Sequence, residues 1–349
     1  MLRQKITKSK WKLNSLAARF LPRSMVLIYH RVVDLDSDPQ RLSVTPDNFE
    51  MQMDVISRNF HPISLKELVN DLANGKIRDR TCVITIDDGY EDNYLHARPV
   101  LEKFGIPATI FVSSGFTGTR REFWWDELDR LILQNQSLPD EVHISVNGTE
   151  HCWPVSDEEH NAGWHVQSTQ TASADNRDRF GRHEIYMGLC QLLQPMDVEQ
   201  INGALVQLRE VTGGSADARQ KYIAMNAEQV RSLHQGGLID IGAHTQSHVN
   251  LATQPVIKQK TEIEGSKSDL ETMLGSKVES FSYPFGALRN YSDQSIKCVK
   301  NAGFNSAVSG YSSNVTRLTS AYEIPRRVVR DWDAETFEMK LTQYYSGRR

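Results

Sequence analysis

Short runs of apolar and β-branched residues alternate with helix-like patterns along most of this chain, and this alternation limits the possible folds more than any other feature. The runs occupy residues 25–29, 82–86, 108–112, 238–242, 280–283 and 306–309. Each run has the length and composition of a buried strand. Helical periodicity predicts helices near residues 46–56, 65–72, 94–104, 226–235, 256–274, 292–302 and 334–344. Strands that alternate with helices indicate an α/β fold with a parallel sheet.

Polar residues follow these runs at the points where the strands are expected to end. The run at 82–86 stops at two adjacent carboxylates, Asp87 and Asp88, which are followed by Gly89. Buried carboxylates are costly unless they are paired, hydrogen-bonded or bound to a cation, and two of them side by side repel each other. If the pair is buried, we therefore expect a metal ion or a shared proton. Taken alone, the pair also fits a solvated Asp-Asp-Gly turn.

Two histidines four residues apart, His244 and His248, follow the run at 238–242. Such a pair is often incidental, but here Asp88 is available at the end of another predicted strand. Two imidazoles and one carboxylate form a three-ligand site with an open position, as in catalytic zinc centres. A divalent ion held there would lower the pKa of bound water and polarise a carbonyl group. The remaining carboxylate, Asp87, would then be a base able to take a proton from the water.

Composition and charge narrow the class of function. The 349 residues are 39% hydrophobic and 24% charged, as in ordinary soluble globular proteins, and the net charge of −4 gives no reason to expect nucleic acid as a partner. The four cysteines lie far apart and include no C-x-x-C pair, which argues against a zinc finger, a redox motif and a disulfide framework. We therefore expect a cytoplasmic protein with no nucleic-acid partner.

Residues 1–24 form a basic segment that we separate from the folded domain. The segment lacks the uninterrupted apolar stretch of a secretory signal, and no part of the chain approaches the ~18 apolar residues of a transmembrane helix. At helical period its apolar residues fall roughly on one side, so peripheral contact with the inner face of a membrane is one interpretation. A helix packed on the domain and a frayed tail are the alternatives.

The pattern changes between about residues 117 and 225, which we interpret as an α-rich insertion because the stretch is too long for a plain loop. Residues 139–154 alternate like a short hairpin, with Asn147-Gly148 as its turn. Trp124, at the start of a helix pattern, is a candidate for stacking on a sugar ring. A position in the core of the insertion is the alternative.

Three ordered motifs at predicted strand ends carry a family resemblance. T-I-D-D-G at 85–89 resembles a T-F-D-D-G motif, H-T-Q-S-H at 244–248 matches H-[ST]-x-x-H, and S-Y-P-F-G at 282–286 resembles R-x-P-[YF]-G. These are motifs of the polysaccharide deacetylases, that is, carbohydrate esterase family 4 with the chitooligosaccharide-deacetylase homology domain. The resemblance covers about residues 25–115 and 226–340. Together the three motifs are a strong signal, although any one alone would be weak.

The resemblance implies a deformed (β/α)7-type barrel over residues 25–345, interrupted by the insertion. It also implies a metal-dependent hydrolase that removes an acetyl group from an N-acetylated sugar and releases acetate and a free amine. Asp87 would be the general base, and a backbone N–H near Tyr283 would hold the oxyanion. The implied ligands of the divalent ion, most simply zinc with cobalt or nickel as alternatives, are Asp88, His244 and His248.

The chain departs from the family pattern at an arginine. Many relatives begin the third motif with Arg, but here that position is Ser282. An arginine that pairs with the base could come instead from Ile-Pro-Arg-Arg at 324–327, and Arg326 is our candidate. The alternative is that Arg326 and Arg327 are surface charges.

The family's late Leu-x-His motif, which supplies the general acid, has no counterpart after residue 250. We expect His30, at the end of the first predicted strand, to take that role, since β/α barrels place catalytic groups at such ends. A structural role for His30 is the alternative. Asp331-Trp332 resembles a D-W motif of the family, but it comes so late in the chain that we treat it as chance.

The preferred functional hypothesis is N-deacetylation of a lipid- or nucleotide-linked sugar, or of a nascent exopolysaccharide, capsule or O-antigen unit. Formyl or O-acetyl groups are alternative substrates, because the same attack by water would serve. From a different class, the chain could be a catalytically impaired carbohydrate-binding protein, as Ser282 and the missing Leu-x-His motif suggest. The presence of Asp87 beside a complete ligand set argues against that alternative.

Overall fold

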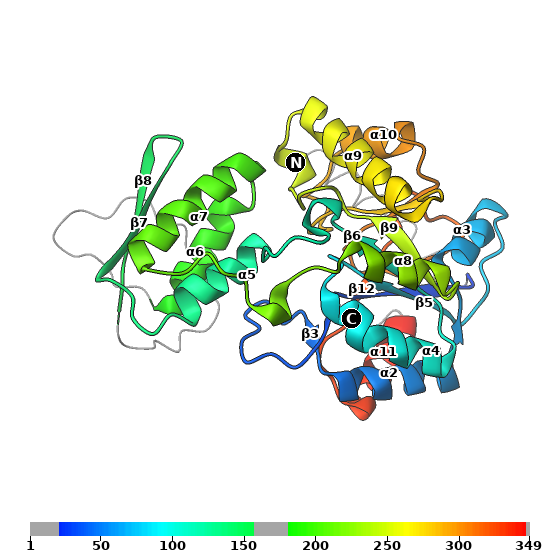
Figure 1. The fold of residues 1–349 in the computed structure, drawn as a ribbon. Helices are drawn as coiled ribbons and strands as arrows, with labels where there is room; N and C mark the ends of the chain where they lie inside the picture. The colour runs from blue at the N-terminus through cyan, green and yellow to red at the C-terminus, as the bar shows by residue number, and fades with distance from the viewer. Residues whose placement is uncertain (1–20, 157–180, 347–349) are drawn as a thin grey trace. The chain divides into compact units, whose positions relative to one another are not determined.

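The computed structural model describes residues 21–156 and 181–346 (Figure 1). The predicted basic segment therefore lies largely outside the described residues. The chain divides into two compact units, the first built from the described residues of Met1–Thr119 and Ile223–Arg349, and the second from those of Arg120–Tyr222. The second unit falls within the stretch interpreted as an insertion.

One parallel sheet forms the centre of the first unit. Its eight strands are β1 (Ser24–Tyr29), β4 (His61–Pro62), β5 (Thr81–Ile86), β6 (Ala108–Val112), β9 (Ile239–Ala243), β10 (Ser280–Ser282), β11 (Ser306–Val308) and β12 (Arg327–Val328). The order is β11-β10-β9-β6-β5-β1-β12, with β4 paired to the start of β5. All six runs predicted from the sequence are strands of this sheet.

The segment 324–328 joins the two edges of the sheet. Ile324 accepts a hydrogen bond from the backbone N–H of Ser309 (2.8 Å) and donates one to Ala307 O (3.0 Å), so it continues from β11. Three residues further on, β12 begins and pairs with β1, with Arg327 opposite Leu27. The sheet is therefore a deformed (β/α) barrel, as predicted.

Helices surround this sheet in the first unit. They are α2 (Pro46–Asn59), α3 (Leu65–Ala73), α4 (Arg98–Phe104), α8 (Ala227–Gln235), α9 (Val256–Leu274), α10 (Asp293–Asn301) and α11 (Ala334–Ser346). In Figure 1, α9 and α10 lie on one side of the strands, and α2, α4 and α11 lie on the other. Ser64 and Asn226 are the N-caps of α3 and α8, because the side chain of each accepts a hydrogen bond from a backbone N–H in the first turn of its helix. Among the described helices, none combines the length and the apolar character needed to cross a bilayer.

Short elements complete the first unit. The strands β2 (Arg31–Val32) and β3 (Ser43–Val44) pair in parallel, one turn of π-helix (Asn93–Ala97) leads into α4, and 3₁₀ turns cover Ser114–Phe116 and Leu251–Thr253. The π turn begins at Asn93, one residue before the expected start of the helix predicted over 94–104. Gly105 ends α4 in the left-handed conformation (φ 61°), which glycine adopts without steric cost.

A buried apolar cluster fills the concave face of the barrel. Its members come from strands that are far apart in the sheet order: Val26, Val83, Phe111, Val308 and Ile324, with Leu65 and Leu68 of α3. Side chains alternate along a strand, so Thr85 and Asp87 lie on the same face as Val83. Asp87, which follows the end of β5, is therefore held at the carboxyl end of the barrel interior.

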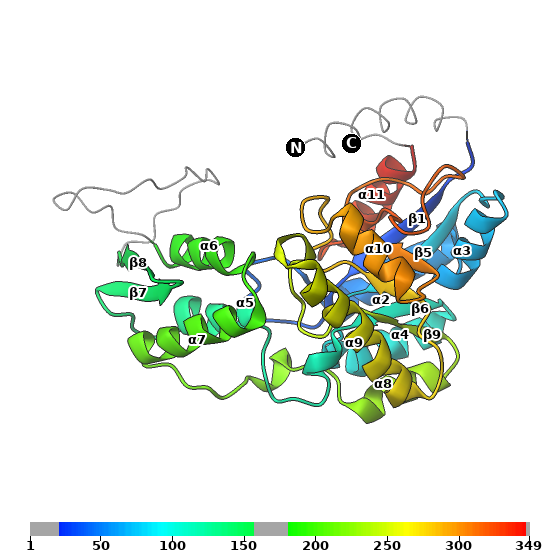
Figure 2. The same ribbon diagram turned by 90° about the horizontal axis from the view of Figure 1, so that it is seen from above.

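The second unit combines helices with a hairpin. Its elements are α5 (Trp124–Leu128), a π turn (Asp129–Leu133), β7 (Glu141–Val146), β8 (Thr149–Pro154), α6 (Arg182–Leu193), α7 (Val198–Thr212) and a 3₁₀ turn (Gln220–Tyr222) (Figure 2). β7 and β8 are antiparallel, and Asn147 and Gly148 both have positive φ, as the predicted turn requires. The hairpin prediction is therefore confirmed.

Candidate active site

Asp87 and Arg326 form a buried, two-pronged ion pair. Asp87 follows β5, and Arg326 lies in the segment that closes the barrel, with a fully buried side chain. Its Nη1 and Nη2 atoms each lie 2.7 Å from one carboxylate oxygen of Asp87. The guanidinium also donates to Thr85 Oγ1 (3.1 Å) and to Ser309 O (2.9 Å). Since Arg326 is 0% exposed, the surface-charge interpretation does not apply to it.

Ser282 completes the surroundings of Asp87. Its hydroxyl donates to Asp87 Oδ2 (3.0 Å) and accepts from Arg326 Nη2 (2.9 Å). Ser282, at the motif position where the family resemblance leads one to expect Arg, thus contacts the Asp87 carboxylate. The guanidinium that pairs with this carboxylate comes instead from Arg326. Burial alone would raise the pKa of Asp87, but Arg326 and His244 lower that pKa below its ordinary value. Asp87 is therefore ionised, as a general base must be.

Asp88, His244 and His248 lie together at the carboxyl end of the sheet, with one potential ligand atom from each residue within 4.8 Å of the others. Asp88 Oδ1 is 3.5 Å from His244 Nε2 and 3.3 Å from His248 Nε2. Ligand atoms bound at about 2.1 Å to a tetrahedral zinc ion are about 3.4 Å apart. The three side chains are therefore spaced to hold such an ion.

The hydrogen bonds at this cluster also fit a cation. Ser282 O lies 2.8 Å from His244 Nδ1, which fixes the proton on Nδ1 and leaves the lone pair of Nε2 directed at the cluster. Asp88 Oδ1 is buried and has no hydrogen-bond partner among the described residues. Burial alone would raise the pKa of Asp88, but the two imidazoles hold that pKa well below its ordinary range. A buried carboxylate oxygen that faces two imidazole nitrogens is the donor set of a divalent metal.

The loops that carry these groups have an unusual backbone. Asp88 (φ 76°), Thr245 (φ 62°), His248 (φ 54°) and Phe285 (φ 60°) adopt positive φ values that residues other than Gly rarely adopt. Such conformations persist only where neighbouring contacts hold them, and they concentrate at functional sites. The Phe285 ring packs edge-on against the His248 ring, with centroids 4.7 Å apart.

The residues after β6 tie the two metal-ligand loops together. Ser113 N–H donates to Asp88 O (3.3 Å), and its hydroxyl donates to His244 O (3.2 Å). Gly115 N–H donates to Gln246 O (2.9 Å), and a Cβ atom at Gly115 would lie only 2.7 Å from that oxygen. No role for Ser113 or Gly115 could be expected from the sequence motifs. The one sequence feature that points to these two residues is their place in Ser-Ser-Gly, directly after the predicted strand at 108–112.

His30 follows β1, at the same end of the sheet. Burial lowers the pKa of its imidazole, while the carboxylates of Asp88 and Asp87 act in the opposite direction. Its main-chain oxygen accepts a hydrogen bond from Asn93 Nδ2 (3.0 Å). The acid role of His30 stays a prediction, and the imidazole would have to gain its proton during the reaction.

Two further candidates have contacts that bear on their predicted roles. The N–H of Tyr283 itself donates to Val308 O (3.2 Å), so this N–H is already used in the sheet. If a backbone N–H near Tyr283 holds the oxyanion, it must therefore come from a neighbouring residue of the same turn, and this role stays a prediction.

Trp124 belongs to the second unit, where it is 6% exposed and packs edge-on against Trp125. This burial agrees with the core alternative, and contact with a sugar stays a prediction.

Comparisons with known proteins agree with this geometry. The sequence model of the family described as polysaccharide deacetylase matches residues 74–179 and 212–307. YxkH of Bacillus subtilis, which carries the name polysaccharide deacetylase, is 32% identical over 127 residues, or 35% of this chain and 44% of YxkH. The poly-beta-1,6-N-acetyl-D-glucosamine N-deacetylase of Staphylococcus aureus is 31% identical over 124 residues, or 32% of this chain and 40% of that protein. The matches thus span less than half of either curated relative.

Solved structures show the same fold. The Streptococcus pyogenes deacetylase PplD, in complex with acetate, has a TM-score of 0.56 at 15% identity, covering 93% of this chain and 99% of PplD. IcaB from Ammonifex degensii has a TM-score of 0.57 at 16% identity, covering 93% of this chain and 97% of IcaB. The family model covers more than half of the sequence, and the chain belongs to the polysaccharide deacetylase family.

Proposed function

We propose that this protein is a metal-dependent hydrolase that removes N-acetyl groups from a carbohydrate made for an exopolysaccharide, a capsule or an O-antigen. The observation that carries the proposal is an ionised, arginine-paired carboxylate directly beside a buried three-ligand cluster. Asp87 Oδ2 lies 3.8 Å from His244 Nε2, so a base and a metal ligand are neighbours. This arrangement suits the attack of water on an amide carbonyl.

Asp88, His244 and His248 would hold the divalent ion, which we propose is zinc, with cobalt or nickel as alternatives. When bound, such an ion polarises a carbonyl group and lowers the pKa of water. In the proposed reaction, Asp87 takes a proton as the water oxygen bonds to the acyl carbon. The carbon–nitrogen bond then breaks, the sugar nitrogen gains a proton, and acetate and a free amine leave.

Asp87 and His30 have different proposed roles in proton transfer, and the contacts of each support its role. Arg326 and Ser282 fix both oxygens of Asp87, which keeps the base ionised and aligned. His30 is the proposed donor of the proton to the leaving nitrogen. Its lowered pKa makes the neutral form the resting state, so His30 would act after receiving a proton in the same turnover.

The proposed substrate is an N-acetylated hexosamine polymer or its lipid- or nucleotide-linked precursor. The name of the Staphylococcus aureus relative, a poly-beta-1,6-N-acetyl-D-glucosamine N-deacetylase, supports a choice among N-acetylglucosamine polymers. We propose further that the protein acts in the cytoplasm and contacts the inner membrane face through residues 1–24. Vesicle flotation of the chain with and without that segment tests the membrane contact.

The Asp87→Asn variant tests the proposal against a carbohydrate-binding role. The amide keeps the size of the side chain but cannot accept the proton, so acetate release should fall by about 10²- to 10⁴-fold while metal content stays unchanged. Substrates carrying an N-acetyl, N-formyl or O-acetyl group distinguish the N-deacetylase from the alternative chemistries. If the wild-type chain binds the sugar, releases no acyl group and is unaffected by the substitution, it is a binding protein.

A further inference from the structure

Helix α9 presents one stripe of side chains to the loop that carries His244 and His248. Glu262 and Asp269 are seven residues apart, which places them two turns apart on the same face, and Gly265 lies between them. All three positions contact the loop.

Glu262 receives three donors from two consecutive residues of the loop. Its Oε2 atom accepts from Gln246 N–H (3.0 Å) and Ser247 N–H (2.9 Å), and its Oε1 atom accepts from the Ser247 hydroxyl. Successive N–H groups that converge in this way form a concave anion site, and here the anion is a side chain of the protein itself. Hydrogen bonds to a charged acceptor are about twice as strong as neutral ones.

Gln246 is seated on the same stripe. Its Nε2 atom donates to Asp269 Oδ2 (2.8 Å), which also accepts from the Ser114 hydroxyl (2.7 Å). A Cβ atom at Gly265 would lie 2.4 Å from Gln246 Oε1, so the absence of a side chain makes room for the amide. The helix therefore holds both the backbone and the side chain of Gln246.

The two residues bound by Glu262 lie between two strained positions. Thr245 precedes them with φ 62°, and the metal-ligand candidate His248 follows them with φ 54°. A strained backbone of this kind costs of order 1–3 kcal/mol at each position and needs contacts that hold it. Glu262 supplies three such contacts to the two residues directly before His248.

We propose that Glu262 is a positioning residue for the metal centre: it clamps residues 246 and 247 so that the His248 imidazole stays directed at Asp88. This inference rests on the metal site proposed above. Replacement of Glu262 should therefore lower the affinity for the metal and not only the stability of the fold. Outer contacts that orient a ligand typically change metal affinity by about 10- to 100-fold.

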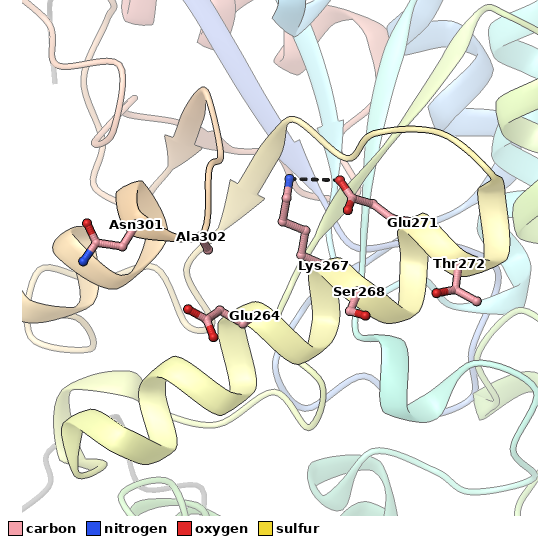
Figure 3. A pocket seen from close by; sticks show the side chains of 7 residues that line it. All are labelled: Glu264, Lys267, Ser268, Glu271, Thr272, Asn301 and Ala302. Atoms are coloured by element: carbon pink, nitrogen blue, oxygen red, sulfur yellow. Dashed lines mark ion pairs between the residues drawn. The ribbon is translucent and has the colours of Figure 1, made fainter.

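The test is a zinc titration of the metal-free chain, compared across four proteins: wild type, Glu262→Gln, Glu262→Ala and Glu264→Gln. Glu264 is the matched control, since it lies on the same helix but borders the open groove between α9 and α10 (Figure 3). Its side chain pairs only loosely with Lys260, at 3.8 Å. The absorption spectrum of the cobalt-loaded proteins gives a second readout, because it reports the geometry around the ion.

We expect both Glu262 variants to bind zinc about 10- to 100-fold more weakly than wild type and to show an altered cobalt spectrum, with Glu264→Gln unchanged. If Glu262→Ala fails to fold, the isosteric Glu262→Gln decides, and Ser247→Ala, which removes one of the three donors, should give a smaller loss. Wild-type zinc affinity in Glu262→Gln, whatever its Tm, overturns the clamp. A wild-type chain that binds no zinc refutes instead the metal site on which the inference rests.

Discussion

Asp87 depends on Arg326 for both of its charge-neutralising hydrogen bonds. Because both side chains are buried, removal of one partner leaves the charge of the other uncompensated. The family motif identified Asp87 as the carboxylate of this pair. For its partner the sequence offered two candidates, Arg326 and Arg327, because the burial of a side chain cannot be predicted from Ile-Pro-Arg-Arg alone.

Arg326→Ala should lower the free energy of unfolding by about 3–5 kcal/mol, the typical cost of breaking a buried ion pair. The neighbouring Arg327 is half-buried and hydrogen-bonds Ser312 (2.8 Å), so Arg327→Ala should cost less than about 1 kcal/mol. Urea denaturation of the two variants measures the difference. Equal losses in both would contradict the assignment of Arg326 as the partner of Asp87.

Gly115 tests the tie between the two metal-ligand loops. An Ala at this position would place its Cβ 2.7 Å from a backbone oxygen that cannot move cheaply, so Gly115→Ala should destabilise by about 1–3 kcal/mol and weaken zinc binding. Gly203, in α7, has open space around its Cβ position, and Gly203→Ala should stabilise by about 0.5–1 kcal/mol. Thermal unfolding that shows the same sign for both would refute the argument.

The side chains that hold the candidate ligands in place, without being ligands themselves, could not be predicted from the sequence. The motif residues Asp87, Asp88, His244 and His248 stand at the ends of recognisable strands, so their meeting at one edge of the sheet could be expected. Glu262 is different, because a carboxylate that accepts backbone N–H groups leaves no pattern in the sequence. Only the folded helix α9 shows that it faces the loop.

At the scale of elements, strands with long apolar runs could be predicted, and very short ones could not. β1, β5 and β6 have five or six residues, all buried, and hence near-continuous apolar sequences. β12 has only two residues, Arg327 and Val328, which are too few to form the apolar run that marks a buried strand. Closure of the barrel depends on that segment, and it was therefore implied only by the family resemblance.

The D-W pair at 331–332, treated as chance in the sequence, has a structural place at α2. Asp331 Oδ1 accepts from the backbone N–H of Thr45 (2.9 Å), from its hydroxyl (2.9 Å) and from Asn48 Nδ2 (2.7 Å), at the start of the helix. Thr45, the N-cap residue, makes no side-chain cap of its own. Asp331 therefore anchors the beginning of α2 from a distant part of the chain.

Asp331→Ala should lower the free energy of unfolding by about 0.5–2 kcal/mol, as the loss of a helix cap does, with no change in kcat. Asn48→Ala, which removes one of the three donors, should cost less. Chemical denaturation and acetate-release assays on the same preparations check both values. A loss of kcat with unchanged stability would place Asp331 in the catalytic machinery instead.

At the scale of the whole molecule, the second unit has its own stabilising network of buried charges. Arg219 donates to Glu122 Oε2 (3.0 Å) and to Asp129 Oδ2 (2.8 Å), and its guanidinium lies 3.5 Å from the centre of the Tyr222 ring. Both carboxylate side chains are no more than 2% exposed. The network joins the first and last segments of the unit, which are far apart in the sequence.

Arg219→Ala should leave these two carboxylates buried without their main partner and destabilise the second unit by about 3–5 kcal/mol. Backbone hydrogen exchange should therefore rise across Arg120–Tyr222 and stay unchanged in the barrel. Arg121→Ala is the control, because that side chain is exposed. Equal acceleration of exchange in the barrel would show that the two units unfold together.

We propose that hydrolysis depends on a metal held by Asp88, His244 and His248, with Asp87 as base. The most direct test is the rate of acetate release from oligomers of β-1,6-linked N-acetylglucosamine, measured before metal removal by a chelator, after removal, and after zinc is restored. We expect metal removal to abolish acetate release, added zinc to restore it, and the His244→Ala/His248→Ala double variant to be inactive throughout. Acetate release that continues at the same rate in the metal-free chain would contradict the proposal.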